Sequence, residues 1–320
     1  MKNQELFLIK IKEKCYLTKL KYKGWCKYTM NLRDFLLNQL ILIRPYSVIN
    51  IAIISIITIV LSTGQLNLQD NKSLVAIIIA LFYWICSMYF AEFLHKNIDN
   101  RKKLYSNKFA ILIYLTFIAF CLIFSPTSLV IFLPVLLVVY LYAAKSKKNI
   151  FSHLLFLFRP APEIGLIYAI LTLYGVNLGI KEINYFIYIV YLISISRNLI
   201  GDVRDIKHDK YTLPKVIGKN KTYLISIIFL IIAGIITIKL NAFFALLPIL
   251  LISTLITFKT NSYALHRIYI TTTGVYFCFL LNTFINNSTL VTSLMFLNFM
   301  VYFTYNLVPR EANENKPSWI

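Results

Sequence analysis

The chain has few charged side chains for its length, and acids are the rarest of them. Charged residues make up 14% of the 320 residues, hydrophobic residues make up 58%, and only 13 residues are Asp or Glu. The mean hydropathy is +0.69. These values exclude a water-soluble globular domain. The composition therefore indicates an integral membrane protein.

Other features are scarce as well, and each absence narrows the possibilities. The five cysteines are scattered and form no CxxC pair, so they are interpreted as reduced filler residues. No linker rich in Pro, Gly or Ser is long enough to separate two domains, which predicts one membrane domain. The first 30 residues are lysine-rich and lack a continuous apolar region, so no cleavable signal peptide is expected.

Several apolar stretches approach the ~20 residues that a helix needs to cross the ~30 Å hydrocarbon core. The sequence predicts an all-α membrane fold with nine or ten transmembrane helices, because the stretch after residue 258 can be divided in two ways. The expected spans are 46–63, 74–93, 109–124, 127–144, 163–180, 184–200, 222–238, 242–258, 264–283 and 289–307. A basic interfacial tail (1–40), a membrane domain (41–307) and a cytoplasmic tail (308–320) follow from this division.

The net charge of +20 would indicate a nucleic-acid partner in a soluble protein, but the positive charges follow a membrane pattern. If loops alternate between the two sides, 30 of the 33 Lys and Arg residues fall on the side of the N-terminal tail. The other three are Lys72, Lys181 and Lys239. Positive charges accumulate in cytoplasmic loops. We therefore expect a multi-pass protein of the cell membrane without a nucleic-acid partner, whose N-terminus and loops 94–108, 145–162 and 197–222 are cytoplasmic.

Three of the 13 acids lie within eight residues, in the stretch GDVRDIKHDKYTLP at 201–214. A second polar set has the same spacing, three and then four residues, and lies 110 residues earlier at the end of a span of the same direction. The two sets are Asp202, Asp205 and Asp209, and Glu92, His95 and Asp99. Such offsets place side chains on one face of a helix. Two of these faces opposite each other in a bundle would line a cavity with carboxylates.

Acids at this spacing repel one another, so the arrangement needs a compensating cation. Ionisable groups at membrane depth are costly and usually functional. Mg²⁺ is commonly held by one or two carboxylates with substrate phosphate oxygens, and it offsets the charge that builds on a leaving diphosphate. The pattern therefore predicts a Mg²⁺-dependent site for a lipid diphosphate. The alternative is a solvated loop in which Arg204, Lys207 and Lys210 neutralise the acids.

The residues DVRDIKHDKYTLPKVIGK (202–219) resemble the second aspartate-rich motif of the UbiA-type membrane prenyltransferase superfamily. That motif reads DxxDxxxD and is followed by a TLP segment and a glycine. The family's first motif, NDxxDxxxD, falls where this chain reads AEFLHKNID (91–99). Arg44-Pro45 before the first span and Lys145 after the fourth are further family-like features. The resemblance covers roughly residues 40 to 283.

The resemblance implies a UbiA-like helical fold around a central cavity open to the bilayer. It implies Mg²⁺ as cofactor and transfer of a prenyl group from a prenyl diphosphate to an aromatic or lipid acceptor, through a carbocation-like transition state. The expected catalytic residues are Asp99, Asp202 and Asp205. The expected metal ligands are Glu92, Asp99, Asp202, Asp205 and Asp209. The expected substrate contacts are Lys145, Arg44, His95, Lys102, Arg197, Asn198, Arg204 and Lys210.

The first motif departs from the family pattern at three positions, because Ala91, Glu92 and His95 replace Asn, Asp and Asp. Glu92 can still bind Mg²⁺, whereas a neutral imidazole is a poor Mg²⁺ ligand. The departures leave four interpretations open: a lost metal position, a diphosphate contact by protonated His95, a changed substrate, or lost activity.

Other functions also stay open. A phosphoribosyl-type transferase and a prenyl diphosphate cyclase of the same superfamily fit the motifs, and an inactive scaffold is a further alternative. A transporter would favour acids near the bilayer midplane and inverted repeats, which the placement of both motifs at one edge disfavours.

Individual residues have two interpretations each. Arg197 and Asn198 contact phosphate, or Arg197 extends to the lipid surface. Glu163 complements the helix dipole or lines the cavity near the acceptor. The remaining histidines, His153, His208 and His266, are expected at the headgroup level without a chemical role.

Overall fold

The structure of the protein is a computed structural model that describes residues 39, 42–67, 70–99, 107–145, 150–176, 179–206, 212–258, 261–285 and 287–307. Within these ranges it describes the backbone alone at residues 95–99, 107, 142–145, 150–152, 263 and 304–307. The chain divides into two compact units, Met1–Gln39 and Leu40–Ile320. All helices named below belong to the second unit.

The described residues form helices and no strands, as the sequence predicts. The α-helices are α3 (Pro45–Thr63), α4 (Asn71–Asp99), α5 (Asn107–Phe124), α6 (Pro126–Lys145), α7 (Ala161–Tyr174), α8 (Lys181–Arg204), α9 (Leu213–Ile217), α10 (Lys219–Lys239), α11 (Leu246–Thr257), α12 (Ser262–Phe284) and α13 (Ser288–Leu307). Two 3₁₀ helices, η1 (Ile150–Phe158) and η2 (Phe243–Ala245), precede α7 and α11.

Six of the described helical segments are long and apolar enough to cross a membrane. They are Pro45–Thr63, Asn71–Leu94, His153–Tyr174, Lys181–Arg204, Lys219–Lys239 and Ala264–Phe284. Four shorter apolar helices are Lys108–Phe124, Pro126–Leu141, Phe243–Thr257 and Ser288–Phe303. The all-helical membrane fold is thus confirmed, and every expected span overlaps a helix. The number of nine or ten crossings stays a prediction.

Prolines and a glycine set where α3 begins and where α7 begins and ends. Pro45 begins α3 and Pro162 lies in the first turn of α7, positions at which the missing N–H breaks no helical hydrogen bond. Gly175 ends α7 in the left-handed conformation, with φ 68°, which glycine adopts without a steric penalty. The expected span 163–180 is therefore too long, because α7 stops at Tyr174.

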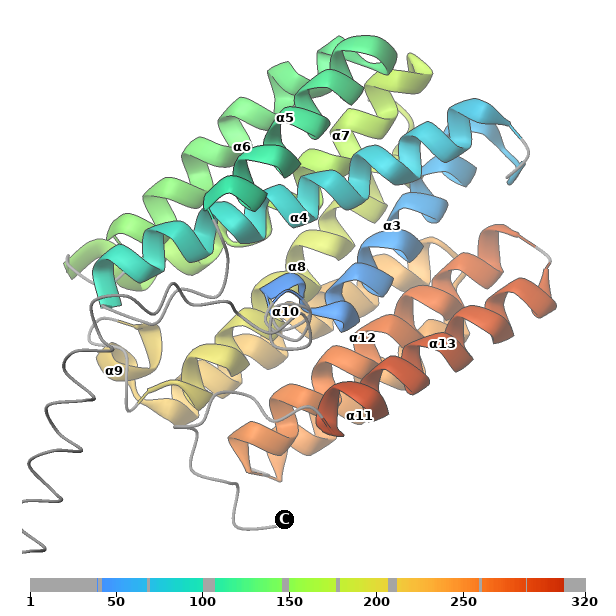
Figure 1. The fold of residues 1–320 in the computed structure, drawn as a ribbon. Coiled ribbons are helices and arrows are strands. Elements are labelled where there is room, and N and C mark those ends of the chain that lie inside the picture. Colours follow the sequence, from blue (N-terminus) through green and yellow to red (C-terminus); the bar gives the residue numbers. More distant parts are fainter. Residues whose placement is uncertain are drawn as a thin grey trace, which may run out of the picture. The chain divides into compact units, whose positions relative to one another are not determined.

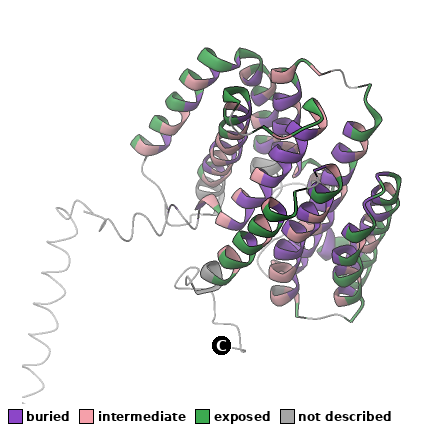
Figure 2. Ribbon diagram, turned by 90° about the vertical axis from the view of Figure 1, so that its right-hand side faces the viewer, coloured by how far each residue is buried: buried purple, intermediate pink, exposed green. Residues whose placement is uncertain are grey.

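Helix α3 lies inside the bundle and holds its parts together. It packs against α4, α7, α8, α12 and α13 (Figure 1). Figure 2 shows buried residues on the facing sides of the helices and exposed residues along the outer sides. Because α3 is surrounded by other helices, its sequence is apolar nearly all round, as expected for a fully enclosed helix.

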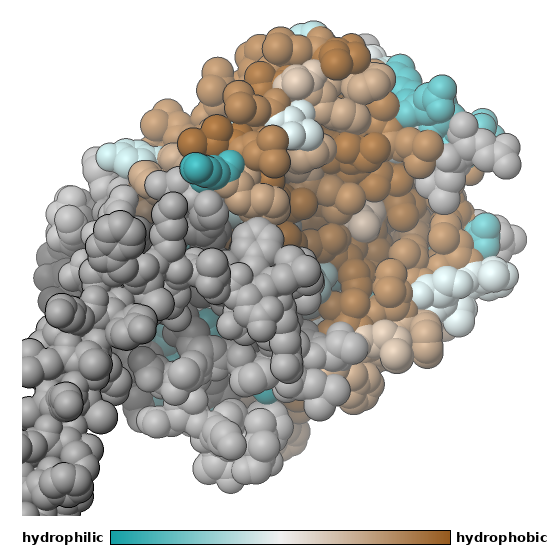
Figure 3. All heavy atoms as spheres, in the orientation of Figure 1, coloured by the Kyte–Doolittle hydropathy of each residue, from teal (hydrophilic) through white to brown (hydrophobic). Residues whose placement is uncertain are grey.

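The outer sides of the bundle carry large apolar side chains. Leucine, isoleucine and phenylalanine residues of α5, α6, α10, α11 and α13 are exposed, and Figure 3 shows one such apolar surface. A soluble monomer rarely exposes an apolar surface of this extent. These outer sides therefore indicate helices that face the lipid bilayer.

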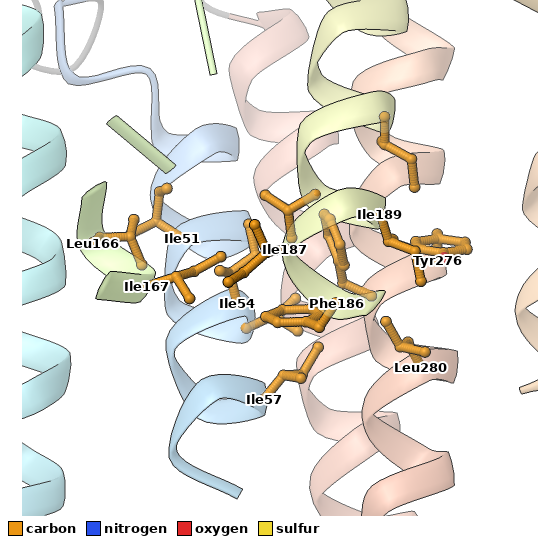
Figure 4. Close-up of a cluster of buried hydrophobic side chains, with 14 of the residues drawn as sticks. Ile51, Ile54, Ile57, Leu166, Ile167, Phe186, Ile187, Ile189, Tyr276 and Leu280 are labelled. Atoms are coloured by element: carbon orange, nitrogen blue, oxygen red, sulfur yellow. The ribbon is translucent and has the colours of Figure 1, made fainter. Parts of the chain in front are cut away.

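The core between α3, α7, α8 and α12 is filled by isoleucine, leucine and aromatic side chains (Figure 4). The labelled members are Ile51, Ile54, Ile57, Leu166, Ile167, Phe186, Ile187, Ile189, Tyr276 and Leu280. Hydrogen bonds of 2.6 Å between Ser196 and Ser226, and between Thr237 and Tyr276, join α10 to α8 and α12. In this part of the described structure, side chains fill the space between the helices, and the central cavity open to the bilayer stays a prediction.

Candidate functional site

Both helices that carry the acidic motifs end on the same side of the bundle. Ser73, in the first turn of α4, shares a hydrogen bond of 3.0 Å with Tyr174 at the end of α7. Arg159, just before α7, forms an ion pair with Asp202 in the last turn of α8. The end of α4 therefore lies on the same side as the end of α8, as Figure 1 also shows. We call this side the motif end.

Two arginines hold Asp202 and Asp205, the two carboxylates of the second motif whose side chains the structure describes. Asp202 is 4% exposed, and its Oδ1 lies 2.6 Å from Arg159 Nη2. Asp205 follows the last residue of α8, and its two oxygens accept hydrogen bonds from Arg204 Nε and Nη2 at 2.7 and 2.5 Å. A planar guanidinium matches a carboxylate in this two-point geometry. The motif end therefore offers carboxylates and cations in one cluster.

Arg159 is absent from the expected site residues. Its position is set by the turn into α7, which begins two residues later at Ala161. Besides its ion pair with Asp202, its Nη1 donates to the backbone carbonyl of Asn198 at 3.2 Å. The expected contact of Asn198 with substrate stays a prediction. The segment RPAPE (159–163) could have indicated Arg159, because prolines fix an arginine directly before a membrane helix.

His266 of α12 extends the cluster. Its Nδ1 lies 3.1 Å from Arg204 Nη1. Helices α8 and α12 approach closely here, since a Cβ added to Gly201 would lie 3.2 Å from His266 Nε2. His266 therefore contacts the arginine that holds Asp205. Its expected place at the headgroup level, without a chemical role, stays a prediction.

The charges at the motif end act most clearly on Asp205. Burial raises the pKa of this carboxyl, but the hydrogen bond and charge of Arg204, with the charges of Arg159 and Arg44, outweigh burial and lower its pKa below the ordinary value. Arg44 precedes α3 and adopts a left-handed backbone conformation with φ 56°. Its expected contact with substrate stays a prediction.

A second ion pair joins α7 to α8 deeper in the bundle. Arg197 Nη2 lies 2.9 Å from Glu163 Oε1, and the two side chains are 12% and 4% exposed. Arg197 is therefore held inside the bundle and does not extend to the lipid surface. Glu163 lies in the first turn of α7, so it complements the helix dipole and also faces the interior. Contact of Arg197 with phosphate stays a prediction.

Several expected site residues lie outside the described side chains. They are His95, Asp99, Lys102, Lys145, Asp209 and Lys210. Glu92 is described and is partly buried on α4. Among the side chains that the structure does describe, no group of three or more His, Cys, Asp or Glu could hold a metal ion. The full set of metal ligands therefore stays a prediction.

The described residues define an all-helical membrane protein with a carboxylate and arginine cluster at one end of its bundle. No family model matches the chain, and no curated protein matches it. A solved structure described as a digeranylgeranylglyceryl phosphate synthase in membranes is similar to it, with 16% identity and a TM-score of 0.49, over 86% of this chain and 97% of that chain.

Proposed function

We propose that this protein is a membrane prenyltransferase, which moves a prenyl group from a prenyl diphosphate to an aromatic or lipid acceptor with Mg²⁺ as cofactor. The observation that carries the proposal is the pair of carboxylates, Asp202 and Asp205, each held by an arginine at the end of a membrane helix. Carboxylates suit a divalent cation and guanidinium groups suit a diphosphate. The resemblance of residues 202–219 to the second UbiA motif supports the same chemistry.

The donor set at the motif end fits Mg²⁺. This ion prefers oxygen ligands and usually takes one or two protein carboxylates, with water and phosphate oxygens completing its shell. Asp202 and Asp205 supply two carboxylates three residues apart. In the proposed site they would hold the ion together with Asp209, Asp99 and Glu92. When bound, Mg²⁺ would offset the negative charge that develops on the leaving diphosphate.

The arginines have a different role in this proposal. In the structure they neutralise Asp202 and Asp205. With a divalent cation at the carboxylates, Arg159 and Arg204 would turn their guanidinium groups toward the diphosphate and would bind it by paired hydrogen bonds. Arg44 adds positive charge at the same place. Because side chains fill the core, the prenyl chain must displace some of them on binding.

The test is a binding and turnover assay on the full chain in lipid nanodiscs. Labelled prenyl diphosphates of several lengths are supplied with Mg²⁺ or with a chelator, and the lipid products are identified by mass spectrometry. We expect Mg²⁺-dependent binding and consumption of a prenyl diphosphate. The Asp202→Asn variant should lose turnover by on the order of 100-fold, because a metal contact of the transition state is removed.

Glu182→Gln is the matched control, because Glu182 is an exposed acid at the opposite end of the same helix. Its turnover should equal that of the unmodified protein. The proposal fails if no prenyl diphosphate binds in a Mg²⁺-dependent way, or if Asp202→Asn keeps full turnover. Consumption of a phosphoribosyl diphosphate instead would replace it with the phosphoribosyl-type reaction.

A further inference from the structure

A small polar pocket lies inside the bundle, next to the Glu163–Arg197 ion pair. Its lining comes from α3, α4, α7, α8 and α12. The lining residues are Ser47, Asn50, Ile51, Ile54, Trp84, Glu163, Ser194, Arg197 and Phe277. The volume is about 10 Å³, which is room for roughly one oxygen atom with its hydrogen. We call it the Asn50 pocket.

The Asn50 pocket contains buried polar atoms that have no partner among the described residues. Asn50 is 3% exposed, yet neither its Oδ1 nor its Nδ2 forms a hydrogen bond with the described residues. Glu163 uses Oε1 for Arg197, while its Oε2 forms no hydrogen bond within the described part of the chain. Buried polar groups in proteins nearly always have a partner. These three atoms therefore indicate a ligand that the pocket is built to hold.

The chemistry of the free atoms selects the kind of ligand. Asn50 Nδ2 can donate a hydrogen bond and Glu163 Oε2 can accept one. A neutral hydroxyl can pair with two of the three atoms, because its oxygen accepts from the Asn50 amide and its one hydrogen is donated to Glu163 Oε2 or to Asn50 Oδ1. A carboxylate ligand would be repelled by Glu163, and a cation would be repelled by Arg197. The pocket is also too small for either group with its hydration shell.

The pocket lies inward from the motif end. Arg197 precedes Asp202 by five residues on α8, which is about 7.5 Å along the helix axis. We infer that the Asn50 pocket binds the hydroxyl group of the acceptor, which makes the acceptor a hydrophobic alcohol or phenol. Its use as an acceptor rests on the proposed prenyl transfer, whereas the binding of a hydroxyl there does not.

Trp84 provides a direct measurement, because it lines the pocket and its indole N–H is fixed by a 2.9 Å hydrogen bond to the Ile43 carbonyl. In a variant with Trp25→Phe and Trp319→Phe, Trp84 is the one tryptophan left of three. Brominated probes quench tryptophan at contact. We compare para-bromophenol with para-bromoanisole, whose hydroxyl is capped, and a bromoalkanol with its bromoalkane, each added to the full chain in nanodiscs.

We expect at least one hydroxyl probe to quench Trp84 roughly tenfold more effectively than its capped or hydroxyl-free partner. Nonspecific entry into lipid cannot produce this result, because the capped probes are the more lipophilic ones. A preference for the phenol or for the alcohol identifies the source of the hydroxyl. Para-bromobenzoate should not quench selectively.

Asn50→Leu should abolish the preference for the hydroxyl probe, because it removes the donor and keeps a similar volume. Ser87→Ala is the matched control. Ser87 lies on α4, outside the pocket lining, and its Oγ is, like the Asn50 amide, buried without a partner among the described residues. Equal quenching by hydroxyl and capped probes, or a preference that survives Asn50→Leu, overturns the inference and leaves the pocket as a site for one water molecule.

The two proposals can fail separately. Mg²⁺-dependent binding of the labelled prenyl diphosphates of several lengths is measured on the same nanodiscs. Hydroxyl-selective quenching without diphosphate binding overturns the proposed function alone. Diphosphate binding without hydroxyl selectivity overturns the acceptor pocket alone.

Discussion

The motif end and the Asn50 pocket are neighbouring polar regions of one bundle, and they compensate their polar groups differently. At the motif end, Asp202 and Asp205 each face an arginine; the side chains of the Arg159–Asp202 pair are 20% and 6% exposed, and those of the Arg204–Asp205 pair are 22% and 37% exposed. In the pocket, Glu163 and Arg197 are nearly buried and three polar atoms lack a partner among the described residues. Partly exposed ion pairs can exchange for ions from water. Buried unpaired atoms can be satisfied only by a ligand or a water molecule that enters the pocket.

The first prediction tests how much stability is lost when the buried Glu163–Arg197 ion pair is broken. Glu163→Leu leaves the Arg197 guanidinium buried without its partner, which should lower the free energy of unfolding by about 3–5 kcal/mol. Thermal and denaturant unfolding of the purified protein, followed by circular dichroism, measures this change. The double variant Glu163→Leu with Arg197→Met should recover most of the loss, because no unpaired charge remains. Equal instability of the single and double variants would contradict the comparison.

The second prediction tests whether the arginines at the motif end can be exchanged. Arg159→Met removes the guanidinium that competes for Asp202, so the protein without substrate should bind Mg²⁺ roughly tenfold more tightly. The same variant should bind the prenyl diphosphate with Mg²⁺ roughly tenfold more weakly, because a guanidinium for the phosphates is lost. Isothermal titration with each ligand measures both affinities. A change of the same sign in both titrations would show that Arg159 does not alternate between partners.

Much of the fold could be predicted from the sequence, because long apolar stretches in a membrane protein are nearly always helices. The ends of the helices and the number of membrane crossings were harder to predict. The span expected at 163–180 includes residues beyond α7, since hydropathy does not report the left-handed glycine at 175 that ends the helix. Whether α5, α6, α11 and α13 cross the bilayer depends on their short apolar lengths, which composition alone does not decide.

The site was predictable only where it follows local spacing. Asp202 and Asp205 stand out because acids are rare and the motif is contiguous. Their partners are tertiary: Arg159 comes from the turn before α7, and His266 comes from α12. Asn50 lies within an apolar helix and carries no sequence signal. Its importance is visible only when the helices around it leave its amide without a partner among the described residues.

The third prediction concerns the stability cost of the pocket. Burying an amide without hydrogen bonds costs about 1–3 kcal/mol, so Asn50→Leu should raise the free energy of unfolding by about that amount. Thermal unfolding without added alcohol or phenol measures it. Ser87→Ala, which removes a single buried hydroxyl elsewhere, should give a smaller gain. A loss of stability in Asn50→Leu would mean that the amide is already satisfied by a bound water.

The smallest expected effect is the pH dependence of Asp205. Burial would raise the pKa of this carboxyl, but Arg204, Arg159 and Arg44 bring it below the ordinary value of 3.8. Because the pKa is lowered in the folded state, the charged carboxylate contributes its stability above the ordinary value and loses it as the pH falls through the lowered value.

Arg204→Met removes the main charge that opposes burial, so the pKa of Asp205 should rise and acid destabilisation should begin at a higher pH. The side chain of Asp205 is 37% exposed, and solvent screening keeps the effect small. Melting temperatures recorded between about pH 3 and pH 6 measure the shift. Glu182→Gln, at the far end of α8, should leave the pH profile unchanged. Identical profiles for Arg204→Met and the unmodified protein would show that Arg204 does not control this carboxylate.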